Sequence, residues 1–493
     1  MWNRLNSSLM FCQGMFGLSF YGVMTILTRF FLEDLGYNES KTMMIVGAFS
    51  AIGPLFAIAG GFIADKVIGA NRALFIAFAT FALGYLMLVL GAASKSVAVS
   101  MTGIALASYA RGLMGPSYPG MFKRTFSSQE SFEKGYPINY SVNNMGALFG
   151  QYLYPLFIVT IAFKGGFLLS ALMAFAAFIV LFIQHKPLAN IGTDIDRSPI
   201  SVNIMLKFLG ISIAMVSLVF FLFSNMDIGQ YIIYAIGSCG VLYFSSLMFT
   251  LPKSDGLRIA AILTICFLTT FFFIYYGQMM TSMNIVAINT MKGDLFGIIP
   301  LAPEANVALN PFWCILAGPM IAGSTTFLEK RNIFIPTAIK ISFAFVLTAL
   351  AFGLLTYAIN SVGPNLSIRS EMFFMVHGLQ GIAEVIVGSL VVAFILSVTP
   401  KQIEGFAVSL YSIAVAVSGI IGAVFSTSIA MEKGQLLTLE FIHGTYGPYF
   451  FKLTIFAVFL VAVAIGCSFV ITSLLKKAKQ IEEEMKIPHE SLK

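Results

Sequence analysis

The chain has 493 residues, of which 58% are hydrophobic and only 10% are charged. Soluble domains carry about 25% charged residues, so this composition excludes a soluble globular protein and indicates an integral membrane protein. The net charge of +7 does not indicate nucleic-acid binding, because the basic residues lie in short loops and in the tail. The five cysteines lie in apolar segments without C-x-x-C spacing, which argues against disulfides and a metal site.

Hydrophobic stretches of membrane-spanning length follow one another along the chain. The first is too long for the core of a signal peptide and no small-residue cleavage site follows it, so we expect it to remain as a span. The predicted spans cover about 11–32, 42–64, 73–94, 97–121, 138–163, 165–184, 204–224, 228–251, 258–285, 309–328, 335–360, 370–398, 402–431 and 448–475. The sequence therefore predicts an all-α polytopic membrane protein with about 14 transmembrane helices.

Loop charges predict the orientation of these spans. A cytoplasmic N-terminus places about 19 Lys and Arg on the inside and about 8 on the outside, as the positive-inside rule requires. With an even number of spans, both termini are then cytoplasmic, and the protein is a multi-pass protein of the cell (inner or plasma) membrane.

The long polar stretch 185–203 divides the chain into parts. We expect an N-terminal six-helix bundle over 1–184, a linker and two-helix hairpin over 185–257, a C-terminal six-helix bundle over 258–475, and a charged cytoplasmic tail over 476–493. The hairpin has few ionisable residues, so it is interpreted as lipid-facing or bridging. Paired halves of this kind are typical of secondary transporters with a site near the bilayer midplane.

One charge lies near the middle of an otherwise apolar or small stretch, 97–121. This residue, Arg111, would lie deep in hydrocarbon at a cost of roughly 2.5–3.5 kcal/mol on insertion scales. We interpret it as lining a substrate path, with a structural ion pair or snorkelling as the alternative. Its planar guanidinium suits a carboxylate or phosphate, and it does not exchange protons near neutral pH.

A second motif, GGFIADKVIG, closes the second span. Gly60 and Gly61 lie on a face that lets a neighbouring helix approach closely, and Asp65 is expected to accept hydrogen bonds from a facing helix N-terminus. We predict that Gly60, Gly61, Asp65 and Gly69 form a gating hinge; a simple loop anchor is the alternative.

This motif resembles the signature of the proton-dependent oligopeptide transporters, a branch of the major facilitator superfamily. Further segments agree with that resemblance, which runs from about residue 13 to 475: Ser19-Phe-Tyr21-Gly22, Gly112-Leu-Met-Gly-Pro116, Tyr140-Ser-Val-Asn-Asn144-Met-Gly146, Gln278-Met-Met-Thr-Ser-Met, Leu309-Asn-Pro-Phe-Trp313 and Ala383-Glu384. The resemblance implies a major facilitator fold with two extra helices between the bundles, proton-coupled symport and a peptide substrate.

Several charged positions of the family are neutral in this chain. The first-helix Glu-x-x-Glu-Arg aligns with Gln13, Phe16 and Gly17, and further charged positions align with Met24, Gly115 and Gly277. Of the usual set, Glu384 remains. We therefore hypothesise that the positive charge of the cavity has moved one turn along the fourth helix, to Arg111.

Glu384 lies midway along its span. We expect this carboxylate to bind a cationic substrate group or to carry the coupling proton, with a structural pairing as the alternative. His377, two turns earlier on roughly the same face, is a candidate for proton coupling or a satisfied polar group. Tyr21, Tyr140, Asn144 and Gln278 are candidate substrate-binding residues that could instead join helices.

These observations predict a secondary transporter of di- or tripeptides, or of a peptide-like carboxylate, that works by alternating access. The alternatives are a divergent transporter of another organic anion or metal-chelating metabolite, and a non-transporting receptor or scaffold. No catalytic constellation, metal cluster or cofactor motif is visible. We expect no enzyme activity, no metal and no cofactor, with the proton gradient as driving force. The expected partners are the solute and the lipid bilayer, no nucleic acid, and the protein is expected to be a monomer.

Overall fold

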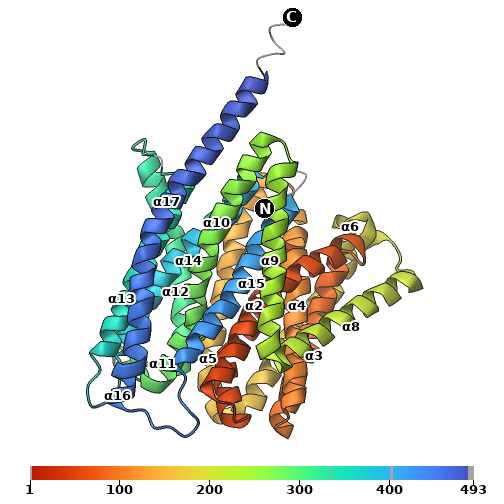
Figure 1. The fold of residues 1–493 in the computed structure, drawn as a ribbon. Coiled ribbons are helices and arrows are strands. Elements are labelled where there is room, and N and C mark those ends of the chain that lie inside the picture. The colour runs from red at the N-terminus through yellow and green to blue at the C-terminus, as the bar shows by residue number, and fades with distance from the viewer. Residues whose placement is uncertain (1–2, 334, 400–403, 487–493) are drawn as a thin grey trace, which may run out of the picture.

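A computed structural model describes residues 3–333, 335–399 and 404–486. Long helices run roughly along one axis and form a bundle (Figure 1). In the first half they are α1 (Arg4–Arg29), extended by the π-helical turn η1 (Phe30–Asp34), α2 (Glu39–Lys66), α3 (Ala70–Ser94), α4 (Val97–Arg124) and α5 (Gln129–Ile183).

The middle of the chain contains α6 (His185–Ile191), α7 (Asp194–Arg197), α8 (Val202–Ser224) and α9 (Met226–Thr250). The second half contains α10 (Lys253–Gly277), η2 (Gln278–Met280), α11 (Ser282–Thr290), β1 (Asp294–Leu295), β2 (Ile299–Pro300), η3 (Pro303–Ala308), α12 (Leu309–Glu329), α13 (Thr337–Asn360), α14 (Ser370–Val398), α15 (Glu404–Ser426), η5 (Thr427–Ile429), α16 (Leu439–Phe441), η6 (Ile442–Tyr446) and α17 (Gly447–Lys486). The two short strands pair antiparallel, with Asp294 opposite Pro300.

The number of spans agrees with the sequence. In the described residues, 13 helical stretches are long and apolar enough to cross a membrane. One of these, within α5, is 54 residues long, which is roughly 80 Å if straight and far more than one bilayer crossing needs. Its backbone leaves the helical region at Ala162 (φ 55°, ψ 176°). This break falls at the end of the predicted span 138–163, so α5 holds two predicted spans and the count becomes fourteen.

Two hydrophobic cores divide the molecule. One gathers buried residues mainly from Leu9 to Ile233, and the other runs from Phe244 to Ile471. The inserted helices bridge them, because α8 packs on α4 of the first half whereas α9 packs on α10 and α15 of the second. The second half begins with α10 at Lys253, five residues before the predicted boundary at 258. The start of α1 and the end of α17 lie at the same end of the bundle (Figure 1).

Glycines set the closest helix contacts. A Cβ on Gly60 of α2 would lie 2.1 Å from the carbonyl oxygen of Gly112 on α4, so these helices meet backbone to backbone. Between the bundles, a Cβ on Gly47 of α2 would lie 2.5 Å from the Cβ of Ala423 on α15. Such small-residue contacts are how membrane helices pack closely without a hydrophobic driving force.

Candidate functional site

A cavity of about 170 Å³ lies between the two bundles. Its walls come from α1, α2 and α4 on one side and from α10, α14 and α15 on the other. The predicted residues Tyr21, Arg111 and Glu384 all line it, together with Tyr276. The structure therefore brings the guanidinium of α4 and the carboxylate of α14 to one cavity, and neither points outward at the lipid.

Arg111 has an unusual environment for a guanidinium inside a membrane protein. Its Nη1 donates to the backbone carbonyl of Ser50 at 2.8 Å, and its Cζ lies 4.7 Å from the centre of the Phe20 ring. In the described part of the chain no carboxylate oxygen lies within the 4.0 Å that defines an ion pair with it. One backbone carbonyl and one ring leave most of its five N–H donors for a ligand.

Gly53 makes room for the Arg111 side chain. A Cβ at that position would lie 2.5 Å from Cδ and 2.9 Å from Cγ of Arg111. The arginine stem therefore runs directly over the backbone of α2. Residue 53 was not a candidate from the sequence, because a glycine in an apolar helix has many possible roles.

Glu384 is held from α12. The Asn310 amide donates to its Oε2 at 2.9 Å, and the Cys314 thiol donates to the same oxygen at 3.4 Å. From the sequence, Asn310 was noted only within the segment Leu309-Asn-Pro-Phe-Trp313, and Cys314 only as one of five cysteines in apolar segments. The missed signal was a polar residue and a thiol one turn apart in an otherwise apolar span.

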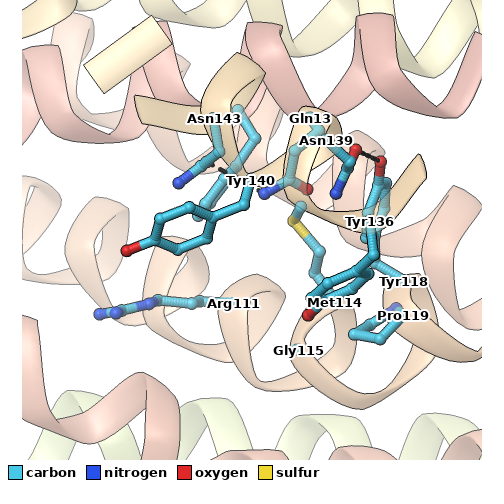
Figure 2. A pocket seen from close by; sticks show the side chains of 11 residues that line it. Gln13, Arg111, Met114, Gly115, Tyr118, Pro119, Tyr136, Asn139, Tyr140 and Asn143 are labelled. Carbon is cyan, nitrogen blue, oxygen red and sulfur yellow. Dashed lines mark hydrogen bonds between the residues drawn. The ribbon is translucent and has the colours of Figure 1, made fainter. Parts of the chain in front are cut away.

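A second cavity of about 190 Å³ lies within the N-terminal bundle, between α1, α4 and α5 (Figure 2). Arg111 lines both cavities. Tyr140 lines this side cavity, and Figure 2 shows its hydroxyl pointing to the same side as the Arg111 guanidinium. Asn144 is not among the lining residues; its amide donates to the carbonyl of Tyr140 at 3.1 Å, within one helix.

The side cavity also contains three of the positions where the resembled family carries charges. Gln13, Phe16 and Gly115 all line it. The Gln13 amide nitrogen donates to Asn143 Oδ1 at 3.0 Å, and its buried Oε1 has no hydrogen-bond partner among the described residues. Neutral side chains therefore line this cavity at positions where the resembled family carries charges.

Gln278 and His377, like Asn144, line neither cavity. Gln278 is fully buried, and its amide nitrogen donates to the carbonyls of Ile274 and Gly422, each at 3.1 Å. Its Oε1 accepts from Ser282 and Ser426. In this conformation Gln278 therefore joins helices through hydrogen bonds, which was the alternative to a role in substrate binding.

His377 is fully buried, and its Nε2 lies 3.0 Å from Asn306 Oδ1. Its Nδ1 has no hydrogen-bond partner among the described residues. It lines neither cavity, so in this conformation it has no direct path to a bound solute.

One end of the bundle is closed by bonds between the two halves. Arg29 donates to Glu304, which is 2% exposed, at 2.7 Å. Glu39 accepts from the Asn289 amide at 3.0 Å and from the Met431 backbone at 2.8 Å. This is the end opposite to the start of α1, so the predicted orientation makes it the extracellular end.

The expectation for Asp65 in the GGFIADKVIG motif is wrong in this conformation. Asp65 is exposed and is not the residue that meets a facing helix N-terminus. Asp196 of the linker does so instead: it is buried and its Oδ1 accepts from the backbone N–H of Asn71 at 2.9 Å. The sequence could not show this, because 125 residues separate the partners.

The glycines of this motif have distinct surroundings. Gly60 meets the Gly112 backbone, whereas Gly61 faces Pro116 at an ordinary 3.6 Å. Gly69 precedes α3 with φ +90°, and a Cβ there would lie 2.3 Å from Asp196 Oδ1. A positive φ combined with this close approach requires glycine at that position.

Comparisons with known proteins agree with this architecture. Dipeptide and tripeptide permease B of Edwardsiella piscicida is 25% identical over 435 residues, covering 87% of this chain and 88% of the relative. Dipeptide and tripeptide permease A of Pectobacterium carotovorum is 23% identical, covering 84% of this chain and 81% of the relative.

Solved structures share the fold. The structure of tetrameric PepTSo2 matches with a TM-score of 0.84 and 20% identity, covering 96% of this chain and 99% of that chain. A POT family transporter in complex with 5-aminolevulinic acid matches with a TM-score of 0.79 and 20% identity, covering 96% of each chain.

The sequence model of the POT family matches residues 71–439, well over half of the chain. The fourteen spans, the two cores and the cavity between them agree with that match. The chain is a multi-pass membrane protein that belongs to the POT family, the proton-dependent oligopeptide transporters of the major facilitator superfamily.

Proposed function

We propose that the protein transports di- or tripeptides, or a peptide-like solute with one carboxylate and one ammonium group. The observation that carries this proposal is the cavity between the bundles, which exposes Arg111 on one wall and Glu384 on the other without an ion pair between them. A zwitterionic solute would satisfy both charges in one pose.

In this proposal Arg111 binds the carboxylate and Glu384 binds the ammonium group. Tyr21 lines the same cavity as both charges, so a solute that lies between Arg111 and Glu384 would also meet this tyrosine. Tyr140 extends the site into the side cavity, and Asn144 supports it through the Tyr140 backbone. The printed names of the relatives, dipeptide and tripeptide permeases, support the same solute class.

Alternating access would then open the two ends in turn. The bonds Arg29–Glu304 and Glu39–Asn289 join the halves at one end and would break when that end opens. The glycine contact between α2 and α4, with the turn at Gly69, supports a hinge in the GGFIADKVIG motif.

The experiment is counterflow in liposomes containing the full chain. Vesicles preloaded with unlabelled dialanine are diluted into labelled dialanine, and transient accumulation of label is expected. Arg111→Met and Glu384→Gln should each reduce it. Absence of both counterflow and dialanine binding, measured by thermal shift, would contradict the proposal.

A transporter of another organic anion is a second candidate. It is favoured by the side cavity, where Gln13 and Gly115 replace charged positions and Arg111 is the cation of the lining. A carboxylate without an ammonium group would then bind better than dialanine in the same thermal-shift assay. A receptor or scaffold predicts binding without counterflow.

The remaining features are proposals of the same kind. We expect an inner or plasma membrane location with both termini in the cytoplasm, no enzyme activity, no metal and no cofactor. We also expect a monomer, which the mass of the detergent-solubilised protein, corrected for bound detergent, would test.

A further inference from the structure

The side cavity in Figure 2 lies beside the charge that would bind the solute carboxylate. Arg111 lines both this cavity and the central one. A dipeptide with its carboxylate at Arg111 and its ammonium group at Glu384 therefore places its C-terminal residue at the boundary between the two cavities. The side cavity has a volume of about 190 Å³, which is room for several waters and hence for an amino-acid side chain.

The lining of the side cavity is polar, and Arg111 is its charged group. The other polar side chains are three amides and three tyrosine hydroxyls: Gln13, Asn139, Asn143, Tyr118, Tyr136 and Tyr140. Among the described residues that line it there is no carboxylate. A cationic side chain would therefore lie near the Arg111 guanidinium without a counter-charge, so the lining favours neutral side chains.

Gln13 has a hydrogen-bond acceptor that the protein leaves unused. Its Nε2 donates to Asn143 Oδ1 at 3.0 Å, whereas its buried Oε1 has no hydrogen-bond partner among the described residues. Buried acceptors are rarely left unpaired, because the missing bond costs free energy. The last torsion of a glutamine side chain is broad, so a small rotation can present Oε1 to the cavity while Nε2 keeps its bond.

Asn139 supplies the complementary donor. Its Oδ1 accepts from the Tyr118 hydroxyl at 2.6 Å, which fixes the orientation of the amide. In the part of the chain that the structure describes, its Nδ2 donates no hydrogen bond. An acceptor on Gln13 and a donor on Asn139 therefore line the same cavity, and a side-chain amide both donates and accepts.

We infer that the side cavity selects the C-terminal side chain of a peptide, and that Gln13 makes it prefer a neutral side-chain amide, as in a peptide that ends in glutamine. This inference rests on the proposed function. The amide N–H of the solute donates to Gln13 Oε1, and its carbonyl accepts from Asn139 Nδ2.

The preference arises from what other side chains leave unpaired. A methionine side chain has a similar length but would leave both Gln13 Oε1 and Asn139 Nδ2 without partners. A glutamate side chain would place an acceptor against the acceptor of Gln13. Sites that form hydrogen bonds to a substrate reject analogues without the bonding group far more strongly than apolar pockets reject a change of size.

The first experiment compares dipeptides that differ in the second side chain, by isothermal titration of the full chain in detergent. Alanyl-glutamine should bind at least about fivefold more tightly than alanyl-methionine, and alanyl-glutamate and alanyl-lysine should bind more weakly than alanyl-glutamine. Equal affinities for alanyl-glutamine and alanyl-methionine would overturn the inference. Tightest binding of alanyl-glutamate would also overturn it, because Arg111 and not Gln13 would then select the side chain.

The second experiment repeats the titrations on Gln13→Met, which removes the amide and keeps the side-chain length. In this variant the ratio of the alanyl-glutamine and alanyl-methionine affinities should fall to about one. Gln151→Met is the matched control: Gln151 is 2% exposed, its Oε1 also has no partner among the described residues, and it lines neither cavity. The control should keep the preference. Its loss in Gln151→Met but not in Gln13→Met would overturn the inference.

Failure of this inference is distinguishable from failure of the proposed function. If the proposed function fails, neither dialanine nor alanyl-glutamine binds, and neither shows counterflow. If the inference alone fails, dialanine binds and alanyl-glutamine binds no better than alanyl-methionine. The peptide series on the unchanged protein gives this answer even if a variant does not fold.

Discussion

On the N-terminal wall of the central cavity, Arg111 bonds one backbone carbonyl and lies over one phenyl ring, with no carboxylate partner in the described residues. On the C-terminal wall, Glu384 is held by the side chains of Asn310 and Cys314 from a neighbouring helix. On the N-terminal wall, most of the Arg111 N–H donors are left for a ligand. On the C-terminal wall, two hydrogen bonds fix the position of the Glu384 carboxyl group. A ligand should therefore depend more strongly on the first wall.

The largest effect is expected from Arg111→Met. Loss of one or more charged hydrogen bonds, each contributing about 1.5–3 kcal/mol, should weaken dialanine binding by at least about tenfold. The apo protein should keep or increase its thermal stability, because removing the guanidinium removes a buried charge without a carboxylate partner. Isothermal titration and a melting curve on the same sample measure both effects, and a lower melting temperature with unchanged binding would assign Arg111 to structure alone.

Gly53→Ala tests how the arginine is positioned. The new Cβ would meet Arg111 Cδ at 2.5 Å, so the side chain must move, and we expect several-fold weaker dialanine binding. Gly120→Ala in α4 is the control, since a Cβ at that position meets no atom within 4 Å, and this variant should bind dialanine normally. Equal affinities in the two variants would show that the position of the Arg111 stem does not matter.

On the opposite wall, Asn310→Ala should have a smaller effect. It removes the 2.9 Å bond to Glu384, and the loss of about 1 kcal/mol corresponds to roughly fivefold weaker dialanine binding. Binding of N-acetylalanine should change little, since it has no group for Glu384. A loss of affinity as large as that of Arg111→Met would contradict the comparison between the walls.

The smallest effect is expected from Tyr140→Phe. The ring remains in place and one neutral hydroxyl at the side cavity is lost, so dialanine binding should weaken by no more than about threefold. Competition binding with dialanine and trialanine measures it, and the longer peptide should be affected more if it reaches the side cavity. An equal loss of affinity for both peptides would indicate that the longer peptide does not reach the side cavity.

The number of helices and their grouping in bundles followed from the sequence. In lipid each span must satisfy its own backbone hydrogen bonds, so the length and hydropathy of a segment are enough to identify it as a membrane helix. Arg111 and Glu384 were also predictable, since an isolated charge in an apolar span is costly and indicates a cavity or partner. Gln278 was selected for its polar amide in an apolar span, but it lies in a hydrogen-bonded helix junction. Polarity alone does not distinguish a ligand contact from a contact between helices.

A second limit of sequence-based prediction is seen at the start of α3, where the acid that accepts a backbone hydrogen bond is Asp196 and not the expected Asp65. Both are acids near the same end of the first bundle, and the motif drew attention to the nearer one in sequence. The linker folds back as α6 and α7 and buries Asp196 against Asn71. Local spacing cannot encode a contact that depends on how a distant segment packs.

The amino-acid sequence by itself determined the membrane location, the spans, their pairing in two bundles and the two buried charges, because each of these follows from the cost of polar groups in hydrocarbon. The tertiary structure alone decided that Gly53 and Asn310 position these charges, and that no ion pair joins Arg111 to Glu384 across the cavity that they share. Those features depend on how closely helices that are distant in sequence approach one another, and only the packing of the bundles sets these distances.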